Sequence, residues 1–348
     1  MIKENTDFVV KQSNVDNCNF VKTILMIIIV IYHSIVFWTG NWFTANPIYS
    51  SNFLRDIALW LNSFHVYTFV MVSGYIYAHI RFNGGYERYI SFIKVKIKRL
   101  LVPYVFVACT WVIPIQYAFF HYDVKIIVTN YVLGTNPNQL WFLLMLFDVF
   151  LIVWPLNNFL RKHNIIGIMV VGVTYLLGIV GDSILPNYFM IWTACGYIPF
   201  FWIGLKIYQY NLTFIYKIPS WVLLIFQVCI FGICNSISTR EEIIFKCIYL
   251  CLLLVLHAVG TIMAFAILQK AANKFKNNKT ILRLSRRSMI IYLYHQQIIY
   301  FFIAGLNGKT LPYANAIINF AGTMLITFII STLLLKFKIT RLLVGEKV

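Results

Sequence analysis

The sequence predicts an all-α polytopic membrane protein with about ten transmembrane helices and both termini in the cytoplasm. Hydrophobic residues make up 60% of the 348 residues, and charged residues only 11%, against about 25% in soluble domains. The apolar residues come in blocks of about 18 to 25, the length that a transmembrane helix needs. The basic residues are distributed unevenly between the segments that join these blocks, which indicates the orientation.

Ten spans are predicted in chain order, at 20–39, 57–80, 99–120, 140–160, 164–181, 188–208, 218–236, 243–269, 287–305 and 313–335. With the N-terminus inside, 24 of the 29 lysine and arginine residues fall on the cytoplasmic side. This is the positive-inside pattern, so the net charge of +18 reflects topology and not nucleic-acid binding. The predicted organisation is a cytoplasmic segment 1–19, a transmembrane domain 20–336 and a cytoplasmic tail 337–348.

The sequence contains neither a cleavable signal peptide nor a cysteine framework for disulfides or metal. The first eighteen residues are polar and mixed in charge, unlike a cleavable signal peptide. The seven cysteines fall mostly inside spans and lack CxxC or metal-ligand spacing, so we expect buried thiols, no disulfide framework and no metal.

The first span carries two ionisable residues, which are costly in a membrane helix and indicate function. Lys22 and His33 are eleven residues apart, and eleven steps of about 100° end about 20° past three full turns. Both side chains therefore lie on one face, about 16 Å apart along the axis. With Lys22 at the membrane surface, His33 lies close to mid-bilayer.

Later spans add further polar residues. His65 reaches a depth comparable to that of His33, and Ser73-Gly74 lies further towards the cytoplasm, where small residues permit close approach. Asp148 is the only carboxylate deep in a predicted span. Two roles are open for it: pairing with a buried histidine or lysine, or adjusting the charge state of an active-site group. His295 lies about 12 Å from the start of the ninth span. His257 has only apolar neighbours and is interpreted as structural.

The main inside loop, residues 81–99, alternates lysines with apolar residues and leads into the third span. One interpretation of its basic residues is positive-inside anchoring. The functional interpretation is a phosphate site at the N-terminus of the third span, formed by Lys98 and Arg99. Pro103 is expected in the first turns of that helix, where its missing N–H has no partner to lose. Residues 270–287 form a second basic segment.

Five motifs carry a resemblance to a known family. They are Lys22 and His33 as a basic-x10-His signature, FHVYTFVMVSGY with His65, Ser73, Gly74 and Tyr75, KIKRLLVPY with Lys98, Arg99 and Pro103, LWFL at 140–143, and SMIIYLYH ending in His295. In this order they resemble the acyltransferase-3 family of integral-membrane acyltransferases, whose members modify bacterial surface polysaccharides, peptidoglycan and related acceptors.

The chain departs from the family pattern at three positions. Asn19 stands where many relatives have an acidic residue, and Asp16, one turn back, takes its place. Tyr67 replaces a proline. Leu146 replaces a glutamate of one large branch, which indicates the stand-alone form without a fused SGNH hydrolase-like domain.

The resemblance implies an O-acetyltransferase of the bacterial cytoplasmic membrane, with acetyl-CoA as donor and a surface or lipid-linked glycan hydroxyl as acceptor. It implies phosphate binding by Lys98 and Arg99, with Lys22 binding phosphate or holding the helix. His33 would act as a general base or accept the acetyl group itself. His65, Asp148 and His295 would orient His33 or the acceptor, and Ser73, Gly74 and Tyr75 would support the substrates. The expected partners are the glycan and membrane lipids, with no nucleic acid.

Three alternatives remain open at the level of sequence. A transporter or flippase for a polysaccharide or lipid-linked sugar also has about ten spans, but needs polar groups along a path open to both sides, whereas here they cluster in spans one to four. A glycan polymerase or ligase usually has large outer loops, and here these are under about 20 residues. A degenerate family member with structural roles only is the third alternative, against which the retained Lys22 and His33 argue.

Overall fold

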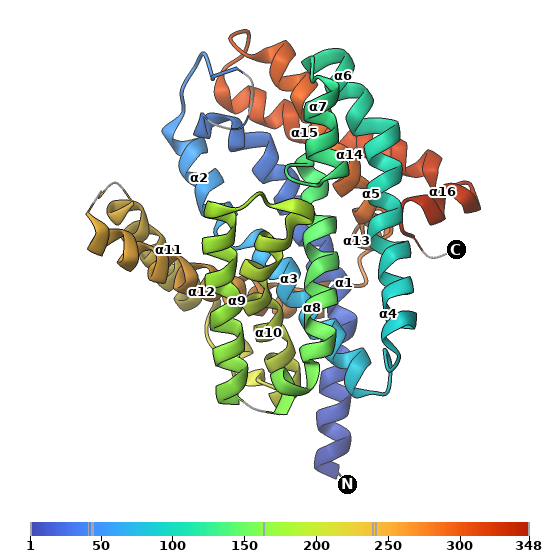
Figure 1. Cartoon of the computed structure of the whole chain (residues 1–348), viewed down its shortest axis with the longest axis vertical. Helices are drawn as coiled ribbons and strands as arrows, with labels where there is room; N and C mark the ends of the chain where they lie inside the picture. Colours follow the sequence, from blue (N-terminus) through green and yellow to red (C-terminus); the bar gives the residue numbers. More distant parts are fainter. Residues whose placement is uncertain are drawn as a thin grey trace.

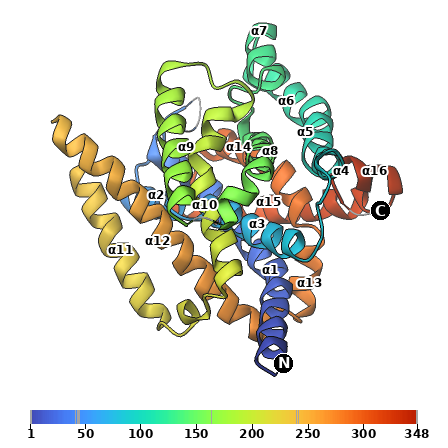
Figure 2. The ribbon, with the colours of Figure 1, turned by 60° about the horizontal axis from the view of Figure 1, so that its bottom comes forward.

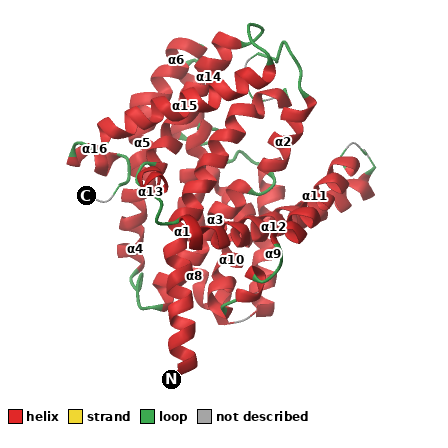
Figure 3. Cartoon of the chain, turned by 180° about the vertical axis from the view of Figure 1, so that it is seen from behind, coloured by secondary structure: helices red, strands yellow, loops and turns green. Residues whose placement is uncertain are grey.

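The structure is a computed structural model that describes residues 2–346 apart from 41, 43, 44, 163, 239 and 241. The described residues form helices and contain no strand (Figures 1 and 3). Parts of the loop at 40–56 and of the predicted terminal segments (residues 1, 347 and 348) lie outside the described residues. The longer α-helices are α1 Ile2–Ile35, α2 Asn52–Asn62, α3 His65–Phe82, α8 Trp141–Lys162, α9 Asn164–Ile184, α10 Ile191–Tyr210, α11 Ser220–Ile237, α12 Ile243–Phe275, α14 Ser288–Leu306 and α15 Pro312–Leu334.

Shorter helical elements connect and extend these. They are α4 Tyr89–Lys96, α5 Val102–Val107, α6 Ile113–Phe120, α7 Val124–Ile127, α13 Lys279–Ser285 and α16 Lys338–Leu343, the π-helical turns η2 Ile97–Leu101, η3 Ala108–Val112 and η4 Val128–Val132, and the 3-10 turns η1 Val36–Thr39, η5 Asn138–Leu140, η6 Tyr188–Met190 and η7 Thr213–Tyr216.

The prediction of ten spans is confirmed. The described part of the chain holds ten helical stretches that are long and apolar enough to cross a membrane, and each overlaps one predicted block. Three of them, α9, α11 and α15, are mostly exposed in the isolated chain, as expected of helices that face lipid. In Figure 2, α11 and α12 lie side by side and project from one flank of the bundle.

The third span differs from its prediction. It begins at Tyr89, ten residues before the predicted start, and α4, η2, α5, η3 and α6 follow one another as one column (Figure 1). Pro103 therefore lies inside the column and not in its first turns. The π-turn η2 ends at Leu101, two residues before Pro103, and such turns occur where the regular helix ladder is interrupted.

The first span also extends beyond its predicted bounds. Helix α1 runs without a break through residue 19, the predicted end of the N-terminal segment. Two side-chain contacts hold this part against α12: Asn17 Nδ2 donates to Asn273 Oδ1 at 2.8 Å, and Gln269 Nε2 donates to the Asn14 carbonyl at 3.0 Å. Residues 14–17 of α1 thus pack against α12 as part of the bundle.

The centre of the bundle is the crossing of α3 and α10, where two glycines let the backbones meet. A Cβ on Gly74 would lie 2.1 Å from the Phe201 carbonyl oxygen, and one on Gly204 would lie 2.0 Å from that of Met71. Neither distance leaves room for a side chain. The predicted close approach at Ser73-Gly74 is confirmed, and it fixes α3 within the core.

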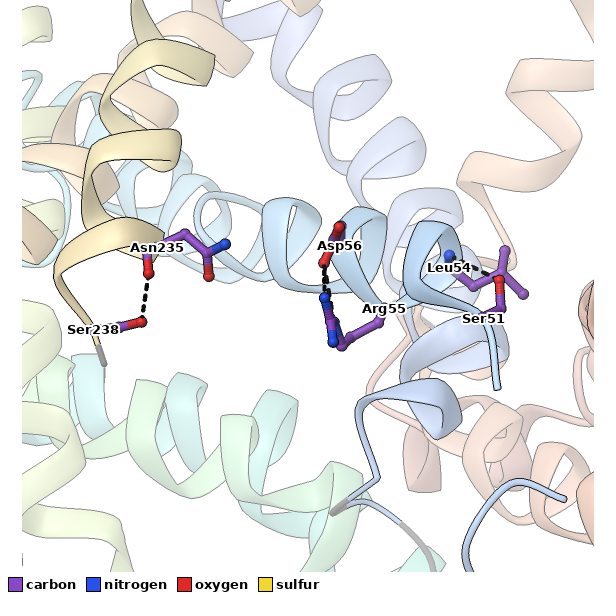
Figure 4. Close-up of polar contacts among 6 residues, drawn as sticks. All are labelled: Ser51, Leu54, Arg55, Asp56, Asn235 and Ser238. Carbon is purple, nitrogen blue, oxygen red and sulfur yellow. Dashed lines mark hydrogen bonds and ion pairs between the residues drawn. The ribbon is translucent and has the colours of Figure 1, made fainter. Parts of the chain in front are cut away.

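Helix α2 is amphipathic and lies near the loop that follows the first span. Ser51 caps its start by accepting from the Leu54 N–H at 3.4 Å, and Arg55 and Asp56 form an exposed ion pair at 3.0 Å (Figure 4). Nearby, Ser238 at the end of α11 donates to the Asn235 carbonyl at 2.8 Å. These contacts close the ends of surface helices and lie apart from the site below.

Candidate functional site

A cavity of about 340 Å³ lies between α1, α3, α8 and α14, beside η2. Its residues divide into a cation end and an apolar middle. Polar and charged side chains line the cation end: Asn19, Lys22, Ser73, Lys96, Arg99, Ser285, Ser288 and Glu346. Aromatic and aliphatic side chains make up the rest of the lining, with Leu100 and Phe150 beside the cations and the others in the middle: Met26, Ile29, Phe69, Leu100, Phe142, Leu143, Leu146, Phe150, Met289 and Tyr292.

Three cationic side chains define the cation end. Lys22 comes from α1, Lys96 from the end of α4 and Arg99 from η2, and each interacts electrostatically with the other two. Lys96 Nζ lies 3.5 Å from the centre of the Phe150 ring, with the Tyr86 and Phe92 rings at 5.1 and 5.2 Å. Aromatic faces stabilise a cation away from bulk water. Three like charges around one cavity would attract a multivalent anion.

Lys98 does not belong to this group, although the resemblance implies a phosphate-binding role for it. Its side chain is exposed and does not line the cavity. Residues 96 and 99 are three apart and share a helix face, whereas residue 98 is turned about 100° from its neighbour. The described lining therefore contains Lys96 in place of Lys98.

The helix N-terminus at the cavity also differs from the expected one. Arg99 lies within a continuous helical column, so the prediction that Lys98 and Arg99 stand at the N-terminus of the third span is wrong. Helix α14 supplies this feature instead, because its first residues Ser288 and Met289 line the cavity, with Ser285 just before them. An N-terminus presents unpaired N–H groups and a positive dipole to an anion.

Three helices carry the lining to the same depth and then place a histidine on the following turn. On α1 the last lining residue is Ile29 and the histidine is His33; on α3 they are Phe69 and His65. On α14, Tyr292 is followed by His295. Because side chains three or four residues apart are neighbours on one helix face, the three histidines form a layer at the end of the apolar middle.

The rings of this histidine layer are in contact. The His33 and His295 ring centres are 4.9 Å apart, and Tyr32 joins His33 to His65, with ring centres 4.9 and 4.7 Å away respectively. On another side, the Trp42 ring lies 5.3 Å from that of His33. The predicted comparable depth of His33 and His65 agrees with this arrangement.

Hydrogen bonds fix the tautomers of two of the histidines. His65 Nδ1 faces the Leu61 carbonyl at 2.7 Å, and His295 Nδ1 faces the Tyr292 carbonyl at 2.6 Å. A carbonyl only accepts, so in both rings Nδ1 carries the proton and Nε2 holds a lone pair. His295 Nε2 and His33 Nδ1 are buried with no hydrogen-bond partner in the described structure. Unpaired buried polar atoms are uncommon and often occur at functional sites.

Two residues of the second-span motif pack the bundle and do not line the cavity. Gly74 lies at the crossing with α10, and Tyr75 is buried against the rings of Tyr208 and Phe265. Ser73 does line the cavity, at its cation end. The motif thus combines one lining residue with two residues that hold α3 in place.

Asp148 and His257 lie outside the histidine layer. Asp148 is buried on α8, two residues past the lining residue Leu146 and about 200° round the helix, and its electrostatic neighbour is Cys195 of α10. His257 Nδ1 faces the Ser63 carbonyl at 2.8 Å, and its ring stacks on Tyr67 at 4.0 Å. The structural interpretation of His257 agrees with these contacts.

Sequence reasoning did not single out Lys96, Tyr292 or Glu346. Lys96 is one of three alternating lysines, and the pattern alone does not distinguish it from the other two. The available signal is that it stands three residues before Arg99, which puts both on one helix face. Tyr292 stands one turn before His295 within a motif already quoted. Glu346 had no signal, because its place depends on how residues 337–346 fold back.

Residues 15–336 match the model of a family described as an acyltransferase domain. No curated protein and no solved structure matches the chain. Because the family match covers nearly all of the sequence, the chain belongs to the acyltransferase-3 family and is a multi-pass membrane acyltransferase.

Proposed function

We propose that this protein is an O-acetyltransferase of the bacterial cytoplasmic membrane. It moves an acetyl group from acetyl-CoA, on the cytosolic side, to a hydroxyl of a cell-surface polysaccharide or its lipid-linked precursor. This proposal rests mainly on one observation. A single cavity extends from three cationic side chains to within one helical turn of the His33–His295 pair. Family membership supports acyl transfer in general.

The cavity fits the parts of an acyl-CoA. Lys22, Lys96 and Arg99 would bind phosphate groups together with the start of α14. The apolar middle suits a narrow pantetheine arm, and about 340 Å³ is at the small end of ligand pockets, so the nucleotide would remain at the mouth. The axial distance of about 16 Å from Lys22 to His33 is comparable with an extended arm.

The proposed chemistry requires one base. A lone pair on His33 takes the proton of the acceptor hydroxyl while its oxygen attacks the thioester carbonyl. The carbon–sulfur bond then breaks, CoA leaves as a thiolate, and the proton on His33 passes to that sulfur. The alternative, in which His33 carries the acetyl group covalently, requires the same ring and differs in forming an acyl-imidazole.

His295 has a positioning role in this scheme. Its Nε2 lone pair is buried and unpaired, and the His33 ring lies against it with an unpaired Nδ1. A hydrogen bond from His33 Nδ1 to His295 Nε2 would leave the lone pair of His33 on Nε2, where the acceptor proton is taken. His65, through Tyr32, would hold the other side of the layer.

A glycan acceptor would approach from the side of His33 away from the cavity. Trp42 lies there, with its ring 5.3 Å from His33 and 4.9 Å from Tyr300. Flat aromatic faces of this kind suit the apolar face of a sugar ring. A lipid-linked sugar would reach the layer through the membrane, in contact with lipids.

The experiment is glycan O-acetylation measured by NMR on surface polysaccharide. The strains are the parent, a deletion, and the deletion complemented with the wild type or with His33→Ala at matched membrane levels. We expect acetyl esters to vanish in the deletion, to return with the wild type and to stay absent with His33→Ala. Normal acetylation in the deletion, with glycan retained inside the cell, would favour a transporter instead.

A further inference from the structure

Residues 337–346, here called the strap, fold back onto the third span and reach the cation end of the cavity. Helix α16 begins the strap, and Val344 behind it is fully buried. Arg341 Nε donates to the Leu335 carbonyl at 2.8 Å, and the Glu346 N–H donates to the Arg341 carbonyl at 2.9 Å. The strap is therefore a fixed part of the structure and not a loose extension of α15.

Gly345 sets how closely the strap approaches. Its φ of +78° belongs to the left-handed region, and a Cβ there would lie 2.8 Å from Pro103 Cγ and 3.0 Å from the Arg99 carbonyl oxygen. Only glycine satisfies both conditions without a shift. This contact brings the next residue, Glu346, into the lining of the cavity.

Glu346 is the one acidic side chain among the described lining residues, and it faces the cations. Its electrostatic partners are Arg99 and Lys22. Burial raises the pKa of Glu346, and the Arg99 and Lys22 charges oppose that rise. The ion pair closer than 4 Å among the described residues is the one between Arg55 and Asp56, and Glu346 forms none with the described cations. Glu346 therefore acts on Arg99 and Lys22 over a longer distance and not by direct contact.

We propose that Glu346 is a built-in counter-anion that competes with the phosphate groups of the donor for the cation end of the cavity. In the empty protein its carboxylate offsets the mutual repulsion of Lys22, Lys96 and Arg99. When a phosphate-bearing ligand binds, the carboxylate repels it, and the strap sets the strength of that repulsion. The identity of the ligand as an acyl-CoA rests on the proposed function; the competition itself requires only an anion.

The geometry favours competition over a supporting role for Glu346. A carboxylate has only acceptors, so it offers no hydrogen-bond donor to a phosphate oxygen. The Ser285 hydroxyl and the N–H groups at the start of α14 supply such donors without it. The effect of Glu346 on a bound phosphate is therefore repulsive, and it keeps donor affinity below the value that the three cations alone would give.

The test measures equilibrium binding to the full-length chain in lipid nanodiscs. The two ligands are CoA and inorganic pyrophosphate, titrated by calorimetry at fixed pH and salt. The variants are Glu346→Gln, which removes the charge, and Gly345→Ala, which pushes the strap away from Arg99. Glu87→Gln is the matched control, because it removes one exposed carboxylate that does not line the cavity. Arg99→Ala reports on the site itself.

We expect Glu346→Gln to bind both ligands about five- to tenfold more tightly, as for one fewer like charge near the phosphates. Gly345→Ala should shift affinity in the same direction, Glu87→Gln should leave it unchanged, and Arg99→Ala should weaken binding. Unchanged or weaker binding by Glu346→Gln would overturn the proposal, and weaker binding would point to a hydrogen bond from the ligand to the carboxylate.

The two ligands separate this proposal from the proposed function. If pyrophosphate binds more tightly to Glu346→Gln but CoA does not bind the parent, the counter-anion stands and the CoA donor fails. If CoA binds the parent, is weakened by Arg99→Ala and is indifferent to Glu346→Gln, the donor site stands and the counter-anion fails. Binding of neither ligand overturns both.

Discussion

His33, His65 and His295 each stand one helical turn beyond the last cavity-lining residue of their own helix. At the scale of single residues, the regular spacing of lining residues and histidines along each helix places the three histidine rings in one layer at the end of the cavity. The shared face of Lys22 and His33 could be predicted, because both lie on one helix and the helical repeat fixes their angle. The contact of His33 with His295 could not be predicted, because it depends on how α1 packs against α14.

The lysines of the third span provide a matched pair. Lys96→Met should raise the KM for the acyl donor about tenfold or more, because it removes one of three cations from the cavity. Lys98→Met should leave KM within about twofold, since its side chain is exposed and outside the lining. Initial rates at varied donor concentration measure both. Equal effects of the two substitutions would contradict the assigned lining.

His295 is predicted to act through His33. His295→Ala should lower kcat by about tenfold to a hundredfold with little change in donor KM, because it leaves the cation end intact but frees the His33 ring. His295→Asn, which retains a polar side chain, should recover part of the rate. The pH–rate profile supplies the decisive readout: a shifted acidic limb indicates a changed environment of His33, whereas an unshifted profile with lower protein yield would indicate a structural role only.

At the scale of elements, the third span shows where sequence reasoning failed. Lysines at 94, 96 and 98 alternate with apolar residues, a pattern that does not distinguish an interfacial segment from a helix over so few residues. Pro103 then suggested a helix start, since proline is common there. The π-turn η2 lets the column continue into Pro103, and this irregularity has no sequence signature of its own.

The crossing of α3 and α10 carries a prediction of stability. Gly204→Ala should lower the melting temperature of the purified protein by several degrees, because the new Cβ would meet the Met71 carbonyl oxygen at 2.0 Å. Gly232→Ala in α11 is the control, since its Cβ would meet nothing within 4 Å and alanine favours a helix interior. A thermal unfolding assay in detergent compares them. Equal stability of the two variants would contradict the tight crossing.

At the scale of the whole molecule, hydropathy and charge predicted the number of spans, because each block of apolar residues must be long enough to cross the bilayer. The strap could not be predicted in the same way. Its position over the cavity follows from the fit of Gly345 against Arg99 and Pro103, a tertiary contact between distant parts of the chain. The orientation in the membrane rests on the distribution of basic residues.

The orientation predicts which residues each side of the membrane exposes. Lys98→Cys should react with an impermeant maleimide only after the inner face is made accessible, and Lys309→Cys should react in intact cells. Both positions are exposed, so the comparison depends on the side and not on burial. Labelling of Lys98→Cys in intact cells would place the cation end of the cavity outside and exclude a cytosolic donor.

We propose that one cavity binds the acyl donor and places its thioester next to His33. The most direct measurement is single-turnover transfer from radiolabelled acetyl-CoA in proteoliposomes that contain the glycan acceptor, with donor binding measured on the same preparation. We expect His33→Ala to bind the donor as tightly as the wild type but to transfer the acetyl group at least about a hundredfold more slowly. Transfer by His33→Ala at the wild-type rate would contradict it.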